Sequence, residues 1–319
     1  MKRYSGWILT ILILMELLVL AYTSTAQQIA DTSFNPSIEN PAYPSGNGPI
    51  VFIDEAHFNF HTFSGRYQPL AALLRKDGYN VMASVSLFNK DSLHNADIMV
   101  ISNALAERNR YDWSLPNPSA FSDDEISTLC DWVKDGGSLM LIADHMPFAG
   151  AAGKLAEGLG VRFSNGFAMN KMANEPTIFR RSEASLLDHP ITNGRTAAER
   201  IDYIATFTGS AFQVRRAAQP LMIFGSSFIS LMPKTAWKFG PGTFRISIQG
   251  WFQGAVFRYG RGRVAVFGEA AMFTAQLAGP NRKPVGMNSP IATQNSQFVL
   301  NVFHWLSGLL DSSAASEED

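Results

Sequence analysis

Carboxylates and imidazoles directly follow three separate apolar runs of this 319-residue chain, at 49–52, 138–143 and 263–267. Short continuous apolar runs are typical of strands buried on both faces of a parallel sheet, and ligands of such sheets bind beyond the carboxyl ends of the strands. The side chains expected at that edge are Asp54, Glu55, His57, His61, Asp144, His145 and Glu269. We therefore predict one site there, with all of these except His61 as candidate catalytic residues.

These residues could carry out general acid–base catalysis without a metal. Carboxylates and imidazoles can accept hydrogen bonds from a small polar or carbohydrate-like ligand and serve as a general acid and base. Ligand pockets also need apolar walls, and the aromatic candidates nearest in sequence or pattern are Phe58, Phe60, Phe63 and Trp251. This chemistry predicts binding of such a ligand, with hydrolysis as its extension.

The other chemistry is a divalent metal that activates water, with a spare carboxylate as base. The candidate metal ligands are His57, His61, Asp144 and His145. The i, i+4 spacing of His57 and His61 would suit one metal on a helix, but the residues at 58–60 are not helical in type and the chain has no His-Glu-x-x-His motif. The sequence indicates no other cofactor.

A purely structural role stands beside both chemistries. Asp54 and Asp144 at strand ends can accept backbone N–H bonds and cap the segments that follow, and His57 or His145 can be a buried histidine with satisfied partners. The single cysteine, Cys130, lies on the apolar face of a predicted helix, which indicates packing and excludes an intramolecular disulfide.

The elements that must position these residues alternate between strands and helices. We predict a helix at 65–76, strands at 79–85 and 97–102, and a small helix at 153–159, with a closing helix at 294–309. Ser122 and Glu125 form a capping box before an apolar helical face that stops at Gly136-Gly137. This alternation predicts a doubly wound α/β fold with a mainly parallel sheet.

The pattern changes between 161 and 250, where short β-like pieces alternate with Gly, Pro and Ser. We interpret this stretch as a β-rich elaboration within one domain that spans 49–310. The runs at 255–259 and 263–267 flank Gly260-Arg261-Gly262, which predicts a hairpin, because no helix follows at once as a phosphate loop requires.

The ends of the chain and its composition place further limits. Lys2 and Arg3, an apolar stretch at 7–22 and Ser24-Thr25-Ala26 predict a signal peptide at 1–26, and hence a periplasmic or secreted protein. An uncleaved membrane anchor is the alternative. An irregular lead-in at 27–48 and an acidic tail at 311–319 flank the domain. The chain is 46% hydrophobic with a net charge of -1, so it can bury a core but offers nucleic acid no basic surface.

The order of several short motifs resembles the glutamine-amidotransferase-like domains of unknown function, relatives of which occur in gliding-motility transport components and intraflagellar transport proteins. The motifs are Phe52-Ile53-Asp54-Glu55-Ala56-His57, Gly136-Gly137, His189-Pro190-Ile191-Thr192, Gly268-Glu269 before Phe273, and Gln294-Asn295 followed by Asn301 and Trp305. The resemblance covers most of the chain after the signal peptide. It implies a flavodoxin-like, three-layer sandwich of the class I glutamine amidotransferase type.

The chain departs from that class at the nucleophile. Glutaminases attack the amide with a cysteine thiolate on a tight strand-to-helix turn, but the corresponding turn at 143–147 has no cysteine, and no Gly-x-Ser-x-Gly elbow replaces it. We therefore expect an exported protein without glutaminase activity that binds, and hydrolyses, a small polar or carbohydrate-like ligand. The alternative is a non-catalytic interaction module of a cell-envelope or transport assembly.

Overall fold

The computed structural model describes residues 28–311, except 174–175 and 216. The predicted signal peptide and the tail beyond residue 311 lie outside the described residues. Within the described part of the chain, no helix has the length and apolar character needed to cross a membrane.

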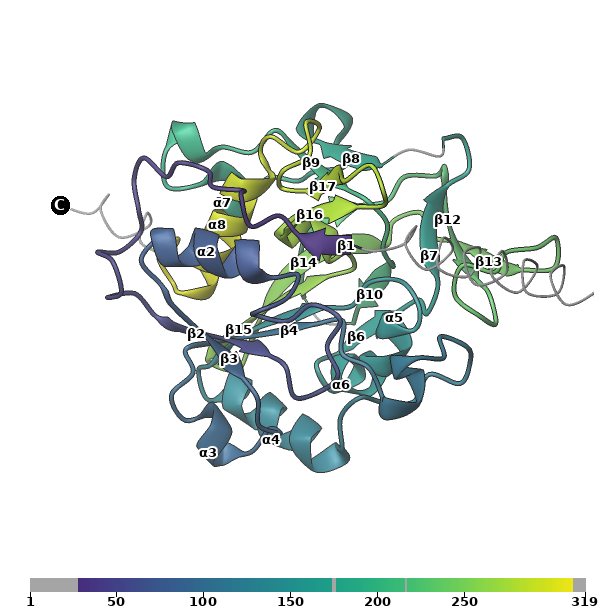
Figure 1. Cartoon of the computed structure of the whole chain (residues 1–319), viewed down its shortest axis with the longest axis horizontal. Helices are drawn as coiled ribbons and strands as arrows, with labels where there is room; N and C mark the ends of the chain where they lie inside the picture. Colours follow the sequence, from purple (N-terminus) through teal and green to yellow (C-terminus); the bar gives the residue numbers. More distant parts are fainter. Residues whose placement is uncertain (1–27, 174–175, 216, 312–319) are drawn as a thin grey trace, which may run out of the picture.

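The apolar runs form the parallel half of a central sheet (Figure 1). Register pairs Ser102 with Ile142 and Ile142 with Phe267, so the strands end at a common edge, as predicted. In spatial order the parallel strands are β3 (Asn80–Ser84), β2 (Ile50–Asp54), β4 (Ile98–Ser102), β5 (Ser138–Ile142) and β15 (Gly262–Phe267).

The sheet continues beyond β15 with antiparallel strands. The predicted hairpin is confirmed, because Tyr259 pairs with Gly262 across a two-residue turn in which Gly260 has a φ of 61°, a conformation that costs glycine least. The antiparallel strands are β14 (Phe252–Tyr259), β10 (Phe212–Val214), β6 (Val161–Phe163) and β11 (Gln219–Ile223).

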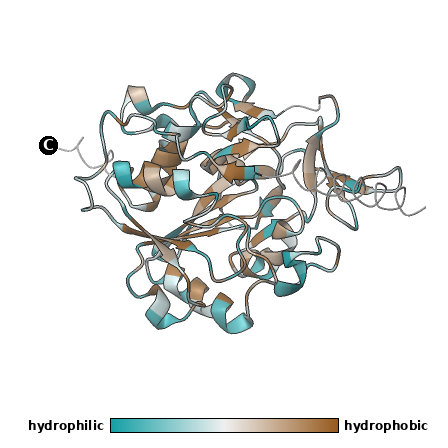
Figure 2. Ribbon diagram, in the orientation of Figure 1, coloured by the Kyte–Doolittle hydropathy of each residue, from teal (hydrophilic) through white to brown (hydrophobic). Residues whose placement is uncertain are grey.

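Helices cover both faces of the sheet, and hydrophobic residues gather along the strands between them (Figures 1 and 2). The side chains of β5 alternate, so that Met140 and Ile142 join one core while Leu139 and Leu141 join the other. The first core packs against α2 (Gln68–Lys76) and α8 (Asn295–Leu306), and the second against α3 (Lys90–Leu93), α4 (Asp123–Lys134) and α6 (Gly153–Gly158). The fold is therefore α/β with a mixed sheet.

The predicted capping box starts α4 as expected. Ser122 accepts a hydrogen bond from the Glu125 backbone N–H, and the Glu125 carboxylate accepts one from the Ser122 N–H. The reciprocal bonds satisfy two of the free N–H groups at the helix start.

Smaller sheets and short helices complete the molecule. The remaining strands are β7 (Phe167–Asn170), β12 (Phe228–Met232) and β13 (Phe244–Ser247) in one sheet, β8 (Thr177–Arg180) with β9 (Tyr203–Thr206), and β1 (Gln28–Ala30), β16 (Ala275–Ala278) and β17 (Lys283–Gly286) in another. The short helices are α5 (Phe148–Ala151) and α7 (Pro190–Asn193), and the 3₁₀ helices are η1 (Glu107–Arg110), η2 (Arg181–Glu183), η3 (Ala197–Glu199) and η4 (Ala271–Phe273).

Strand β1 differs from the irregular lead-in predicted at 27–48. Its three residues pair antiparallel with β16, Gln28 opposite Ala278. A strand this short has no periodic pattern to detect, and it forms because a distant strand offers its backbone groups as partners.

Candidate functional site

A cavity of about 500 Å³ lies at the carboxyl edge of the parallel strands. The connections after β2, β4, β5 and β15 all contribute to its wall, and between β2 and β4 the strand order reverses, which is the usual position of ligand sites in such sheets. Its polar side chains are Gln28, His61, Asn103, Asp144, His145, Thr208 and Gln276. Its large apolar ones are Phe60, Trp113, Phe148, Phe207, Trp237 and Val285.

Asp144 and His145 follow β5 and stand side by side in the wall. The Asp144 Oδ1 atom accepts a 2.7 Å hydrogen bond from the His145 backbone N–H. The His145 ring lies 2.6 Å from the Met146 carbonyl through Nδ1, and because a carbonyl only accepts, the proton belongs on Nδ1. The Nε2 atom therefore carries the lone pair, and among the described residues nothing donates to it.

Asn103 links this pair to His61. The Asn103 Oδ1 atom accepts from the Asp144 N–H at 2.9 Å, and its Nδ2 atom lies 3.2 Å from His61 Nδ1. Asn103 has a φ of 49°, a left-handed conformation that asparagine tolerates better than most residues. Since the amide nitrogen only donates, His61 accepts through Nδ1 and its proton belongs on Nε2.

Three buried polar atoms at the cavity lack a protein partner. They are His61 Nε2 and both amide atoms of the fully buried Gln276. A buried polar atom without a hydrogen bond costs free energy, so the folded protein keeps groups here that a ligand or water must satisfy.

The pKa of His61 is well below its usual value. Burial is the largest cause, and the positive charge of Arg66 adds to it. His61 is therefore a neutral donor rather than a cation at the wall of the cavity.

Glu269 lies behind the cavity and caps η4. Its two carboxylate oxygens accept from the N–H groups of Ala271 and Met272 at 2.9 and 2.7 Å. Burial, and next the charge of Asp144, raise the pKa of Glu269 well above its usual value despite these bonds. Beside it, the buried Tyr67 hydroxyl donates to the Ala270 carbonyl and accepts from Ser102.

Asp54 and His57 do not join this cluster, contrary to the expectation of one shared site. Asp54 shares the face of β2 that points toward α4 with Phe52. His57 bonds Asp54 through Nδ1 at 2.9 Å and Glu125 through Nε2 at 2.9 Å. Its ring packs against Phe88 and Phe121, so both ring nitrogens are occupied away from the cavity.

Glu55 also lies outside the cavity wall, half-buried, where it accepts from the Ser64 N–H at 3.3 Å. Of the four proposed metal ligands, His61, Asp144 and His145 line the cavity and His57 does not. Across the described residues, no three His, Cys, Asp or Glu side chains are grouped as a metal site requires. A divalent metal stays a prediction from the sequence.

The apolar wall consists mostly of residues that the sequence did not single out. Of the four predicted aromatics only Phe60 lines the cavity, whereas Phe58 and Phe63 stack with Arg110 and Arg75 and Trp251 packs against a core. Asn103 was detectable, because it directly follows a predicted strand. Trp113, Trp237 and Gln276 come from irregular connections and a small sheet, and no local pattern indicates them.

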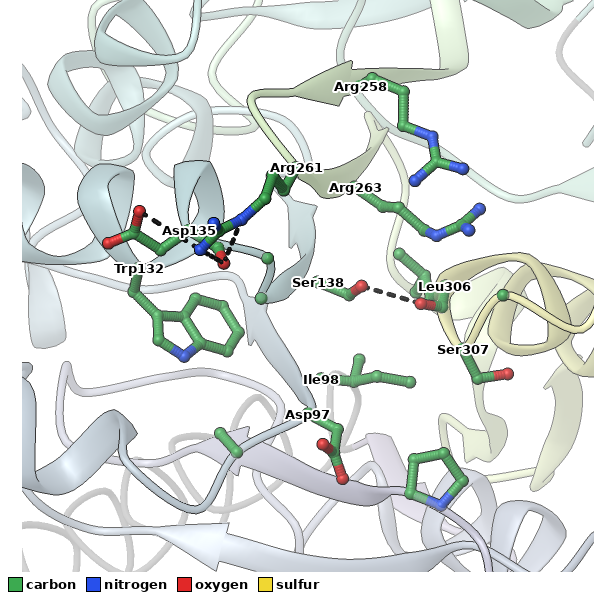
Figure 3. A pocket seen from close by; sticks show the side chains of 15 residues that line it. Asp97, Ile98, Trp132, Asp135, Ser138, Arg258, Arg261, Arg263, Leu306 and Ser307 are labelled. Atoms are coloured by element: carbon green, nitrogen blue, oxygen red, sulfur yellow. Dashed lines mark hydrogen bonds and ion pairs between the residues drawn. The ribbon is translucent and has the colours of Figure 1, made fainter. Parts of the chain in front are cut away.

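A second cavity, about 630 Å³, lies at the amino ends of the parallel strands (Figure 3). It contains three arginines, but Arg258 and Arg263 pair with Asp311, and Arg261 donates to the Asp135 carbonyl at 2.7 Å. The unpartnered buried atoms found in the described residues do not lie in it. The polar groups at the carboxyl edge therefore mark the better candidate site.

Comparison with known proteins places the fold. No protein-family model and no curated protein matches the chain. The mmIFT52 N-terminal domain matches 81% of this chain and 97% of its own length with a TM-score of 0.54 and 14% identity. This likeness agrees with the sequence resemblance at the level of the fold alone.

Two further solved structures are similar over most of the chain. A cytoplasmic protein of Salmonella typhimurium has 17% identity and a TM-score of 0.46, with 81% of this chain and 98% of that one covered. A ThuA-like protein of Bacteroides uniformis has 11% identity and a TM-score of 0.44, with 85% and 94% covered.

Proposed function

We propose that the cavity beyond β4 and β5 binds a small polar, carbohydrate-like ligand, which the protein then hydrolyses. The observation that carries this proposal is the presence of buried hydrogen-bonding atoms without protein partners, His61 Nε2 and the Gln276 amide, in one cavity. Such atoms are costly in a folded protein and are expected where a ligand completes them.

The donors and acceptors suit a polyhydroxyl ligand. His61 Nε2–H and the Gln276 NH₂ group can donate, while Asp144, His145 Nε2 and the Gln276 carbonyl can accept. Hydroxyl groups both donate and accept, so a ring bearing several of them can satisfy this mixed set. Trp113 and Trp237 provide the apolar surface that the faces of such a ring need.

His145 is the residue best suited to start hydrolysis. Its Nδ1–H is anchored on the Met146 carbonyl, which leaves the Nε2 lone pair free to take a proton from water. The hydroxide oxygen then bonds to the electrophilic carbon of the ligand while the scissile bond breaks, and the proton passes from Nε2 to the leaving group.

The finer fold assignment belongs to the same proposal. The parallel strands lie in the order β3-β2-β4-β5-β15, which corresponds to the flavodoxin-like order 2-1-3-4-5, with helices on both faces. Cys130 lies in α4 rather than on the turn after β5, and we therefore propose a member of the amidotransferase-like class without glutaminase activity.

The test is a thermal-shift panel of sugars, amino acids and divalent ions, because a ligand that binds only the native state raises the unfolding midpoint. We expect sugars to raise it in the unmodified protein and not in the double variant Asp144→Asn/His145→Ala. Asn keeps the oxygen that accepts from the His145 N–H, whereas Ala removes a buried ring that stacks on Phe167. Each sugar shift of the double variant is therefore measured against its own midpoint without sugar.

The matched control is His94→Ala, which removes an exposed histidine and should leave every shift unchanged. The proposal fails if no sugar raises the midpoint, or if the double variant responds to sugars as the unmodified protein does.

A further inference from the structure

We infer that the ligand carries an ammonium group and that Asp144 is its counter-ion, so that the substrate class is a polyhydroxylated amine such as an amino sugar. The inference rests on the proposed function and adds that the cavity prefers a positively charged ligand. Asp144 is the one acidic side chain among the described residues that line the cavity, and none of those lining residues is a lysine or an arginine.

The Asp144 carboxylate keeps acceptor capacity toward the cavity. It is 6% exposed, its Oδ1 atom accepts one short bond from the His145 N–H, and its Oδ2 atom has only a long 3.4 Å contact with the Ala270 N–H. A carboxylate can accept about four hydrogen bonds, and a nearly buried charge without a cation is costly. An ammonium group would supply three donors and the missing positive charge.

Among residues 28–311 that the structure describes, no lysine or arginine forms an ion pair with this carboxylate. The Arg66 guanidinium lies 3.8 Å from the centroid of the Phe60 ring and donates to the Phe60 carbonyl, and it is not part of the cavity wall. His61 is neutral, because burial, with the charge of Arg66, holds its pKa well below the usual value. On the far side of Asp144 lies another carboxyl group, Glu269, which adds no positive charge.

The rest of the wall agrees with a cationic ligand. Phe60, Trp113 and Phe148 pack edge-on or tilted against one another with ring centroids 5.2 to 5.5 Å apart, and aromatic faces attract cations and repel anions. The hydroxyl groups of the same ligand would pair with Gln276 and His61. A ligand that carries both an amine and hydroxyl groups therefore matches this cavity better than a metal ion or a neutral sugar does.

The experiment compares matched sugars on the full chain by calorimetry and ligand-observed NMR at neutral pH. The probes are glucosamine, galactosamine and mannosamine, their parent hexoses, their N-acetyl forms, and glucuronate. We expect at least one amine to bind about tenfold or more tighter than its parent hexose and its N-acetyl form, and glucuronate to bind more weakly than glucose. Asp144→Asn should reduce the amine preference to near unity.

The matched control is Glu157→Gln, which removes the same unit of charge from an exposed position on α6 and should keep the preference. Hexoses that bind as tightly as the amines would overturn the inference and leave the proposed function standing. Failure of every sugar to bind would overturn both. The glucuronate comparison uses the unmodified protein, so it decides the question even if Asp144→Asn does not fold.

Discussion

Two clusters of carboxylates and imidazoles lie near the carboxyl ends of the parallel strands, and they differ in how completely their polar atoms are paired. On the α4 side, His57 is held between Asp54 and Glu125, with both ring nitrogens bonded at 2.9 Å. In the other cluster, His61, His145 and Asp144 line a cavity in which His61 Nε2 and the Gln276 amide have no protein partner.

The difference separates a structural role from a binding role better than residue type does. A saturated buried network stabilises the fold and has nothing left to offer a ligand. An unsaturated one costs stability and keeps its hydrogen-bonding capacity for a molecule that enters. We therefore propose that the Asp54–His57–Glu125 cluster stabilises the fold and that the Asp144–His145–His61 cluster binds the ligand.

The largest expected loss of stability comes from removing His57, the centre of the fully paired cluster. His57→Ala should lower the free energy of unfolding by about 3 kcal/mol or more, because it leaves two carboxylates without their shared partner in a nearly dry site. Chemical denaturation of the variant and the unmodified protein measures the difference. Sugar binding by the folded variant should be unchanged.

The control for this prediction is His94→Ala, an exposed histidine whose removal should change stability by less than about 0.5 kcal/mol. A stable His57→Ala protein that has lost sugar binding would reverse our assignment of the two clusters.

The next largest effect is expected from two buried glutamines that differ in their hydrogen bonds. Gln253 accepts a bond from Thr206 and donates one to the Thr208 carbonyl, at 2.9 and 3.0 Å, whereas neither the Oε1 nor the Nε2 atom of Gln276 has a protein partner. Gln253→Leu should cost about 2 kcal/mol of stability, because it leaves both partners unpaired. Gln276→Leu should be neutral or stabilising by about 1 kcal/mol, since it removes an unpaired amide from the interior.

Denaturation curves and the sugar panel together check this pair. Gln276→Leu should weaken sugar binding while it keeps or raises the unfolding midpoint. A Gln276→Leu protein that loses as much stability as Gln253→Leu would mean that protein groups already satisfy this amide.

The sequence was sufficient for much of the framework that carries these clusters. The apolar run at 138–143 became β5 and the Ser122–Glu125 box started α4, because strand burial and helix capping are local properties with clear patterns. The convergence of β4, β5 and β15 at one edge followed from the parallel connection alone. Of the residues singled out from the sequence, Asp144, His145 and His61 line the cavity.

The division between the clusters could not be predicted in the same way. Asp54 shares its face of β2 with Phe52, but the sequence does not say which face of a sheet will carry a cavity. Glu125 reaches His57 from 68 residues further along the chain, and Gln276 enters the site from a small sheet formed with β1 and β17. These are long-range contacts without a local pattern.

The last prediction is that His57 and His61 change the stability of the protein with pH in opposite directions. Burial alone would lower the pKa of His57, but the bonds and charges of Asp54 and Glu125 outweigh it and raise the pKa above its ordinary 6.5. The folded state then binds the proton more tightly than the unfolded state, so this stabilisation is fully present below about pH 6.5 and is lost as pH rises through the folded pKa. His61 behaves oppositely, because burial depresses its pKa and the folded state loses stability as pH falls below about 6.5.

Unfolding free energies measured across this range for the unmodified protein, His57→Gln and His61→Gln test the sign. The advantage of the unmodified protein over His57→Gln should shrink as pH rises past 6.5, whereas its advantage over His61→Gln should grow as pH rises toward 6.5 and then level off. The loss of unfolding free energy should be smaller than in the truncations above, because glutamine still fills the space of each histidine. Opposite pH dependences of the two stability differences would nevertheless show that the two histidines have opposite surroundings. If both stability differences changed with pH in the same direction, one of the two histidines would not have the surroundings described here. Either His57 would not be paired with carboxylates, or His61 would not be buried without them.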